Sequence, residues 1–89
     1  MFKRTDSGFY LGEDPQQPLA EIEYIPLGEN ELSITHTYVA AALRGQGMAE
    51  KLVDLVADLA RVQGKKLSAT CTYAQKALAE KAKYADVIK

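Results

Sequence analysis

The chain has 89 residues, of which 47% are apolar and 26% are charged, a composition typical of one globular domain. Its net charge of −1, and the lack of a basic run with interleaved aromatic residues, argue against nucleic acid as a partner. The start of the chain lacks the apolar core of a signal peptide, no apolar run could span a membrane, and the single cysteine excludes an internal disulfide. We therefore expect one cytoplasmic domain over residues 1–89.

The first half of the sequence has the patterns of β-strands. Residues 8–11 are short and apolar and predict an edge strand, which a polar turn over residues 12–18 follows. Residues 19–27 alternate apolar and acidic side chains, as a half-buried antiparallel strand does. Residues 31–39 are rich in β-branched side chains and predict the third strand.

The period of two in a strand sets the faces of this third strand. It places Leu32, Ile34, His36 and Tyr38 on one face. Because Leu32 and Ile34 are apolar, we expect this face to be buried. His36 would then be a hydrogen-bonded histidine of the core or of a cleft, or else a general base.

The second half of the sequence predicts two helices and a fourth strand. A helix is expected from about residue 46 to residue 63, because apolar residues recur at helical spacing and Gly64 follows as a left-handed C-terminal residue. The apolar residues are Met48, Leu52, Leu55, Val56, Leu59 and Val62. Residues 67–71 predict a strand, residues 74–82 a second helix, and residues 84–88 an apolar tail that could pack back. The strand–helix–strand order implies parallel pairing of residues 33–39 with 67–71. The expected fold class is α+β, with a mixed sheet of three antiparallel strands plus a parallel strand after a crossover helix.

The turn over residues 39–49, between the third strand and the long helix, has an unusual composition. It contains no Ser, Thr, Asp or Asn that could cap the helix, and it carries Arg44 where an acidic residue would suit the helix dipole. Gly45 and Gly47 remove side chains from backbone whose N–H groups point outward. Unpaired donors, a cation and missing Cβ atoms predict a site for an external anion, most simply a phosphate. The alternative is a tight turn in which glycine only supplies a positive φ and Arg44 is a surface charge.

The distribution of charge agrees with an anionic ligand. Residues 32–89 carry nine basic and five acidic groups, whereas residues 1–31 carry two basic and seven acidic groups. In a strand–helix–strand unit, ligands bind at the carboxyl ends of the strands, so Val39, the Arg44 turn and Cys71 should meet at one edge. We expect no metal site, because one His and one Cys are too few ligands for zinc. No Walker lysine follows the glycines, which argues against a nucleoside triphosphate.

The pattern Arg44-x-x-Gly47-x-Ala49, after a strand that ends in valine and before an amphipathic helix, resembles the pyrophosphate loop of the GNAT N-acetyltransferases. Three further segments resemble a branch of very small, single-domain GNAT-like proteins: His36-Thr37-Tyr38-Val39, Thr70-Cys71-Thr72-Tyr73 and Tyr84-Ala85-Asp86. The similarity extends over nearly the whole chain. It implies a minimal GNAT-like (acyl-CoA N-acyltransferase) fold and acetyl-CoA or CoA as cofactor.

The resemblance also implies roles for individual residues. Backbone amides of the glycine loop, with Arg44, would bind the pyrophosphate, and the pantetheine would run beside the end of the third strand. The cofactor-binding residues are then Tyr38, Val39, Arg44, Gly45, Gln46, Gly47, Met48, Ala49 and Lys76. The catalytic residues are Cys71, His36 and Tyr73, where Tyr73 would protonate the departing thiolate. From the residues alone, a lone cysteine such as Cys71 is more often a buried small side chain than a catalytic one, and Tyr73 could equally serve only to pack the second helix.

The expected function is transfer of an acetyl group from acetyl-CoA to an amine, in a small molecule or a protein. Two alternatives stay open. The domain could bind CoA without turnover, as a sensor or interaction module. It could also be a structural protein in which the glycine turn merely connects two elements.

Overall fold

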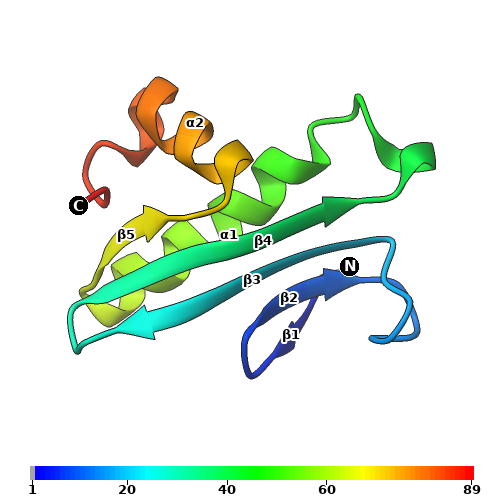
Figure 1. The fold of residues 1–89 in the computed structure, drawn as a ribbon, viewed down its shortest axis with the longest axis horizontal. Coiled ribbons are helices and arrows are strands. Elements are labelled where there is room, and N and C mark those ends of the chain that lie inside the picture. The colour runs from blue at the N-terminus through cyan, green and yellow to red at the C-terminus, as the bar shows by residue number, and fades with distance from the viewer. Residues whose placement is uncertain (1) are drawn as a thin grey trace.

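The computed structural model describes residues 2–89 and forms a five-stranded sheet with two α-helices (Figure 1). The elements in chain order are β1 (Phe2–Thr5), β2 (Gly8–Leu11), β3 (Ala20–Leu27), β4 (Glu31–Val39), the 3₁₀ turn η1 (Ala41–Leu43), α1 (Met48–Gln63), β5 (Lys66–Ala69), α2 (Thr72–Glu80) and the 3₁₀ turn η2 (Ala82–Tyr84). The strands lie in the order β1-β2-β3-β4-β5, and only the β4–β5 pair is parallel. The predicted mixed sheet with a parallel strand after a crossover helix is confirmed, and β1 is a further antiparallel strand that the sequence analysis missed.

The parallel pairing is shorter than predicted and lies at the start of β4. It joins Glu31–Ile34 to Lys66–Ala69, after which the amides of Thr70 and Cys71 both donate to the carbonyl oxygen of Ile34. The chain then leaves the sheet and enters α2. The second half of β4, residues 35–39, therefore has no β5 neighbour along that edge.

A β-bulge in β4 reverses the alternation of its side chains. The register pairs Tyr24 with Ile34 but Glu23 with His36, so Thr35 is an extra residue on β4. One extra residue moves every later side chain to the opposite face of the sheet. Even-numbered side chains of β4 therefore face the core before the bulge, and odd-numbered side chains face the helices after it.

The bulge makes one sequence prediction wrong. Ile34 is buried, but the side chain of His36 is 48% exposed and Tyr38 is 41% exposed. Both lie on the face of the sheet that carries the acidic residues of β3, because Tyr38 pairs with Glu21 in the register. Thr37 and Val39 instead lie on the face of the sheet that the helices cover.

One hydrophobic core lies between the sheet and the helices. α1 packs across β3, β4 and β5, while α2 packs on α1, β4 and β5. From α1 the core includes Leu52, Val53, Val56, Ala57 and Ala60. The C-terminal tail packs back as predicted, with Tyr84 and Val87 buried and Ile88 bridged to Leu67 of β5.

The buried face of α1 is rotated relative to the predicted apolar stripe. Val53, Ala57 and Ala60 face the core, whereas Val62 is 84% exposed and Leu55 is only half-buried. Small residues on a helix allow close packing against a sheet, which is why the alanines lie inward. No helix described over residues 2–89 is both long and apolar enough to cross a membrane.

These positions predict how substitutions in α1 change stability. Leu52 is fully buried, so Leu52→Ala should lower the free energy of unfolding by about 2–5 kcal/mol. Val62→Ala should change it by less than about 0.5 kcal/mol, because the side chain is already in water. Urea unfolding of both variants and the parent chain measures the difference. Similar losses for the two variants would contradict the orientation of α1.

Candidate functional site

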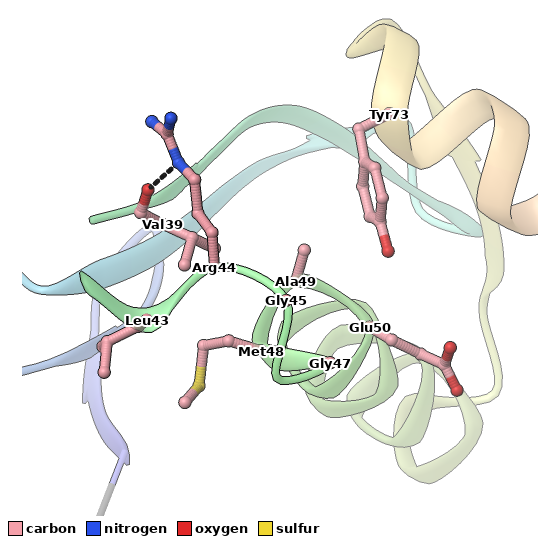
Figure 2. A pocket seen from close by; sticks show the side chains of 9 residues that line it. All are labelled: Val39, Leu43, Arg44, Gly45, Gly47, Met48, Ala49, Glu50 and Tyr73. Atoms are coloured by element: carbon pink, nitrogen blue, oxygen red, sulfur yellow. Dashed lines mark hydrogen bonds between the residues drawn. The ribbon is translucent and has the colours of Figure 1, made fainter. Parts of the chain in front are cut away.

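A cleft of about 250 Å³ opens where the end of β4 meets the starts of α1 and α2 (Figure 2). Its lining residues are Val39, Leu43, Arg44, Gly45, Gly47, Met48, Ala49, Glu50 and Tyr73. Most of the predicted cofactor residues therefore gather here, with Tyr73 on the opposite wall. Gln46 belongs to the same loop, but its side chain reaches back to the carbonyl oxygen of Ala42 at 3.5 Å.

The start of α1 has no cap from the chain itself. Gly47 occupies the N-cap position with φ of 74°, and Gly45 has φ of 81°. The first hydrogen bond of the helix runs from the amide of Lys51 to the carbonyl oxygen of Gly47, at 3.1 Å. Among residues 2–89, no backbone or side-chain oxygen accepts a hydrogen bond from the amides of residues 45–50.

The space in front of these amides is open. A Cβ atom added at Gly45 or Gly47 would meet no other atom within 4 Å. The packing of the protein therefore does not require glycine at either position, although the positive φ does favour it. Unpaired N–H groups at the positive end of a helix, with open space before them, fit a phosphate or diphosphate.

The cleft includes an acidic residue that the sequence analysis did not assign to it. Because α1 begins at Met48, Glu50 lies in the first helical turn, where a carboxylate could reach back and cap the Gly47 amide. Instead, Lys83 donates to one carboxylate oxygen, and the Lys81 ammonium lies 3.2 Å from the other. Hydrogen bonds from Lys83 and then Lys81 lower the pKa of Glu50.

This arrangement has two consequences for the cleft. The Glu50 carboxylate is ionised but its charge is compensated, so it does not repel an anion as a lone carboxylate would. Its oxygens are also occupied, which leaves the helix amides without an acceptor. The sequence does not predict these ion pairs, because Lys81 and Lys83 are about thirty residues away from Glu50 and contact α1 only in the folded structure.

Arg44 connects the turn to the end of β4. Its Nε donates to the carbonyl oxygen of Val39 at 3.0 Å. Figure 2 shows the two terminal nitrogens pointing away from Gly45 and Gly47. In this conformation the side chain fixes the turn, and direct pairing of Arg44 with a phosphate stays a prediction.

Cys71 lies at the start of α2, beside β4. Its Sγ is 3.4 Å from the Oγ1 of Thr37, which the bulge has turned toward the helices. Burial raises the pKa of the Cys71 thiol, but hydrogen bonding by Thr37 and the backbone amides of Ala74 and Tyr73 outweighs it, and the net pKa is lowered. Thr37 is thus a site residue that strict alternation hid, because alternation assigned it to the face opposite the core.

The structure does not bring His36 to Cys71. His36 is on the opposite face of β4, with Nε2 3.4 Å from a carboxylate oxygen of Glu21. Possible ligand atoms of Glu21, Glu23 and His36 lie within 4.8 Å of one another on this exposed face. Tyr38 shares that face, so its side chain does not line the cleft.

Tyr73 and Lys76 are placed by α2. The ring of Tyr73 is 39% exposed, and Figure 2 shows its hydroxyl pointing toward the first turn of α1, near Ala49 and Glu50. Burial, together with the charge of Glu50, raises the pKa of Tyr73, so the hydroxyl stays protonated and able to donate. Lys76 lines a second cavity that adjoins Tyr73.

Comparison with known proteins identifies the family. Residues 8–87 match the family model described as GCN5-related N-acetyltransferase. The chain belongs to the GCN5-related N-acetyltransferase family. That the glycine loop at the start of α1 binds acyl-CoA stays a prediction.

Known structures support the same family. A solution structure from Staphylococcus aureus, described as a GCN5-like N-acetyltransferase, superposes with a TM-score of 0.88 and 37% identity, covering 100% of this chain and 87% of that one. Ribosomal-protein-alanine N-acetyltransferase from Brucella melitensis biovar Abortus shares the fold, with a TM-score of 0.55, 22% identity and coverage of 85% of this chain and 62% of that one. N-acetyltransferase 8B of Rattus norvegicus is 35% identical over 63 residues, which are 65% of this chain and 28% of the rat protein.

The environment of Cys71 predicts its reactivity. Because the pKa of the thiol is lowered, its alkylation by iodoacetamide should rise with pH around a midpoint below that of an ordinary cysteine. Thr37→Val removes the hydroxyl at nearly constant volume and should move this midpoint upward. Mass spectrometry of alkylated protein across a pH series measures both midpoints. An unchanged midpoint in Thr37→Val would show that the hydroxyl does not tune the thiol.

Proposed function

We propose that this domain is an acetyl-CoA-dependent N-acetyltransferase that acts on an amine. The observation that carries the proposal is the uncapped start of α1, whose unpaired amides face a cleft with open space before them. Membership of the GCN5-related family supports the same ligand. The diphosphate of CoA would accept hydrogen bonds from the amides of residues 45–49.

The unpaired edge of β4 offers a path for the rest of the cofactor. Residues 35–39 of β4 have no β5 partner, so backbone groups on this edge are available to an extended chain that carries amides of its own. The pantetheine arm of CoA has this chemistry. A path from the glycine loop along Val39 leads toward Thr37 and Cys71, where the acyl group would arrive.

The residues around the end of this path support acetyl transfer. Acetyl-CoA supplies the acetyl group as an activated thioester. An amine beside the unpaired edge of β4 would attack its carbonyl carbon, and backbone groups of that edge would hold the carbonyl oxygen. Tyr73 has a raised pKa, so its hydroxyl is protonated at neutral pH and would donate a proton to the sulfur that leaves if the thioester reaches it. Cys71 has a lowered pKa and could instead accept the acetyl group first and pass it to the amine.

The experiment that tests this proposal follows thiol release from acetyl-CoA. The amine panel contains a lysine peptide, a peptide with a free N-terminus and a polyamine. We expect release with at least one amine, together with transfer of the acetyl group detected by mass spectrometry. Acetyl-CoA binding without release for any amine would instead favour the CoA-binding sensor or interaction module.

The role of Cys71 follows from the same assay. Cys71→Ala should abolish release if the enzyme passes through an acetylated cysteine, and an acetyl group on Cys71 should then be trapped when no amine is present. If Tyr73 is the proton donor in a direct transfer, Tyr73→Phe should lower kcat by about 10²–10⁴-fold with little change in CoA binding. Full activity in both variants would exclude both routes.

Two glycines at opposite ends of α1 provide a matched test of the phosphate site. Gly47 and Gly64 have φ of 74° and 67°, and an added Cβ meets no atom within 4 Å at either one. Gly47→Ala and Gly64→Ala should therefore each lose about 1–2 kcal/mol of stability from the left-handed backbone. Only Gly47→Ala should lose CoA affinity, measured by calorimetry, because its methyl group enters the anion site. Equal affinities in the two variants would contradict this location.

A further inference from the structure

Three side chains that can bind a metal ion meet on the exposed face of the sheet. They are Glu21 and Glu23 of β3 and His36 of β4, and one possible ligand atom of each lies within 4.8 Å of the other two. His36 comes to this face because the bulge at Thr35 reverses the alternation of β4. His and Cys residues alone predict no zinc site in this sequence, but the fold adds two carboxylates to the single histidine.

The paired strands fix the spacing of these side chains. Glu23 and His36 are direct cross-strand partners, and Glu21 precedes Glu23 by two residues, which places both carboxylates on one face of β3. Beside the bulge, the Thr35 hydroxyl donates to the carbonyl oxygen of Glu23 at 3.4 Å. Ligands that two hydrogen-bonded strands carry are held more precisely than ligands on a loop.

The distance between His36 and Glu21 fits two ligands of one zinc ion. Nε2 of His36 lies 3.4 Å from Oε2 of Glu21, which is longer than the distance of about 2.7–3.2 Å usual for an N–H···O hydrogen bond. Zinc binds imidazole nitrogen and carboxylate oxygen at about 2.0–2.2 Å, so two such ligands of a tetrahedral ion lie roughly 3.4 Å apart. Glu23 is exposed, so its side chain can rotate to bring an oxygen to the same ion.

The two carboxylates also lack compensation by a basic side chain. Among residues 2–89, no lysine or arginine forms an ion pair with Glu21 or Glu23. Lys3 is on the same face two strands away, but its ammonium lies 5.9 Å over the ring of Tyr10. A divalent cation would offset the repulsion between the carboxylates. The imidazole favours a transition metal over Mg²⁺ or Ca²⁺, which prefer oxygen ligands.

We propose that Glu21, Glu23 and His36 form a binding site for Zn²⁺. The ion would cross-link β3 and β4 on the exposed face of the sheet. Three protein ligands leave one position of a tetrahedral ion to water. None of the three residues lines the cleft at the start of α1, so this inference does not depend on the proposed function.

The first test is calorimetric titration of the full chain with zinc chloride in a buffer that does not bind metal. We expect the parent chain to bind a single ion. Affinity should fall by about tenfold or more in both His36→Gln and Glu23→Gln, because each variant lacks one of three ligands. Glu29→Gln is the matched control. It removes an exposed carboxylate from the turn between β3 and β4 and should bind zinc as the parent chain does.

The second test locates the ion by NMR. The chain has one histidine, so the imidazole signals come from His36 alone. Zinc should shift these signals in the parent chain. Cys71 is the other side chain with a natural affinity for zinc, and it lies on the opposite face of the sheet, beside Thr37. Cys71→Ser should therefore show the same zinc-dependent shift of the imidazole signals.

Several results would overturn the proposal. A parent chain that does not bind zinc excludes the site, and so does full affinity in His36→Gln and Glu23→Gln. Loss of binding in Cys71→Ser would place the ion at the thiol instead. Equal affinity for Mg²⁺ and Zn²⁺ would show that the imidazole is not a ligand. None of these results bears on CoA binding, so the proposed function is tested separately.

Discussion

The arrangement of the site depends on the uncapped start of α1. Gly47 has no side chain to offer, and Glu50, which could have bonded back to the Gly47 amide, is held by Lys81 and Lys83. The helix therefore presents its first amides and the positive end of its dipole to the cleft. This depends on two segments that are far apart in the sequence, the start of α1 and the C-terminal segment. The lysines contact Glu50 only when the C-terminal segment packs against α1. The same tail that completes the core thus keeps the Glu50 carboxylate from capping these amides.

The unpaired edge of β4 is the second constraint, and it results from the early end of β5. Parallel pairing stops at Ile34, and the chain turns into α2 at Cys71, so the sulfur lies beside a strand edge without a neighbour. The bulge at Thr35 then turns Thr37 toward that sulfur. A thiol with a lowered pKa thus lies beside an unpaired strand edge as a result of strand geometry.

The sequence predicts those parts of the fold that local patterns determine. The order of strands and helices, the C-terminal end of α1 at Gly64 and the glycine loop follow from periodicity, from turn residues and from the missing cap. The face on which His36 lies cannot be predicted in this way, because a single bulge inverts the alternation of side chains and no neighbouring residue in the sequence indicates the bulge. The roles of Thr37 and Glu50 were missed for a related reason, since each depends on a partner more than thirty residues away. β1 was missed because its residues are mostly exposed and polar, as the short edge strands of sheets often are.

The most direct measurement is a titration of isotopically labelled protein with CoA, followed by amide NMR. The central claim is that main-chain amides at the start of α1 are unpaired and bind the diphosphate. It predicts that the amide signals of Gly45, Gln46, Gly47, Met48 and Ala49 shift most, and that inorganic pyrophosphate shifts the same signals. Unchanged signals from these residues, or shifts confined to the exposed face of the sheet around Glu21 and His36, would contradict it.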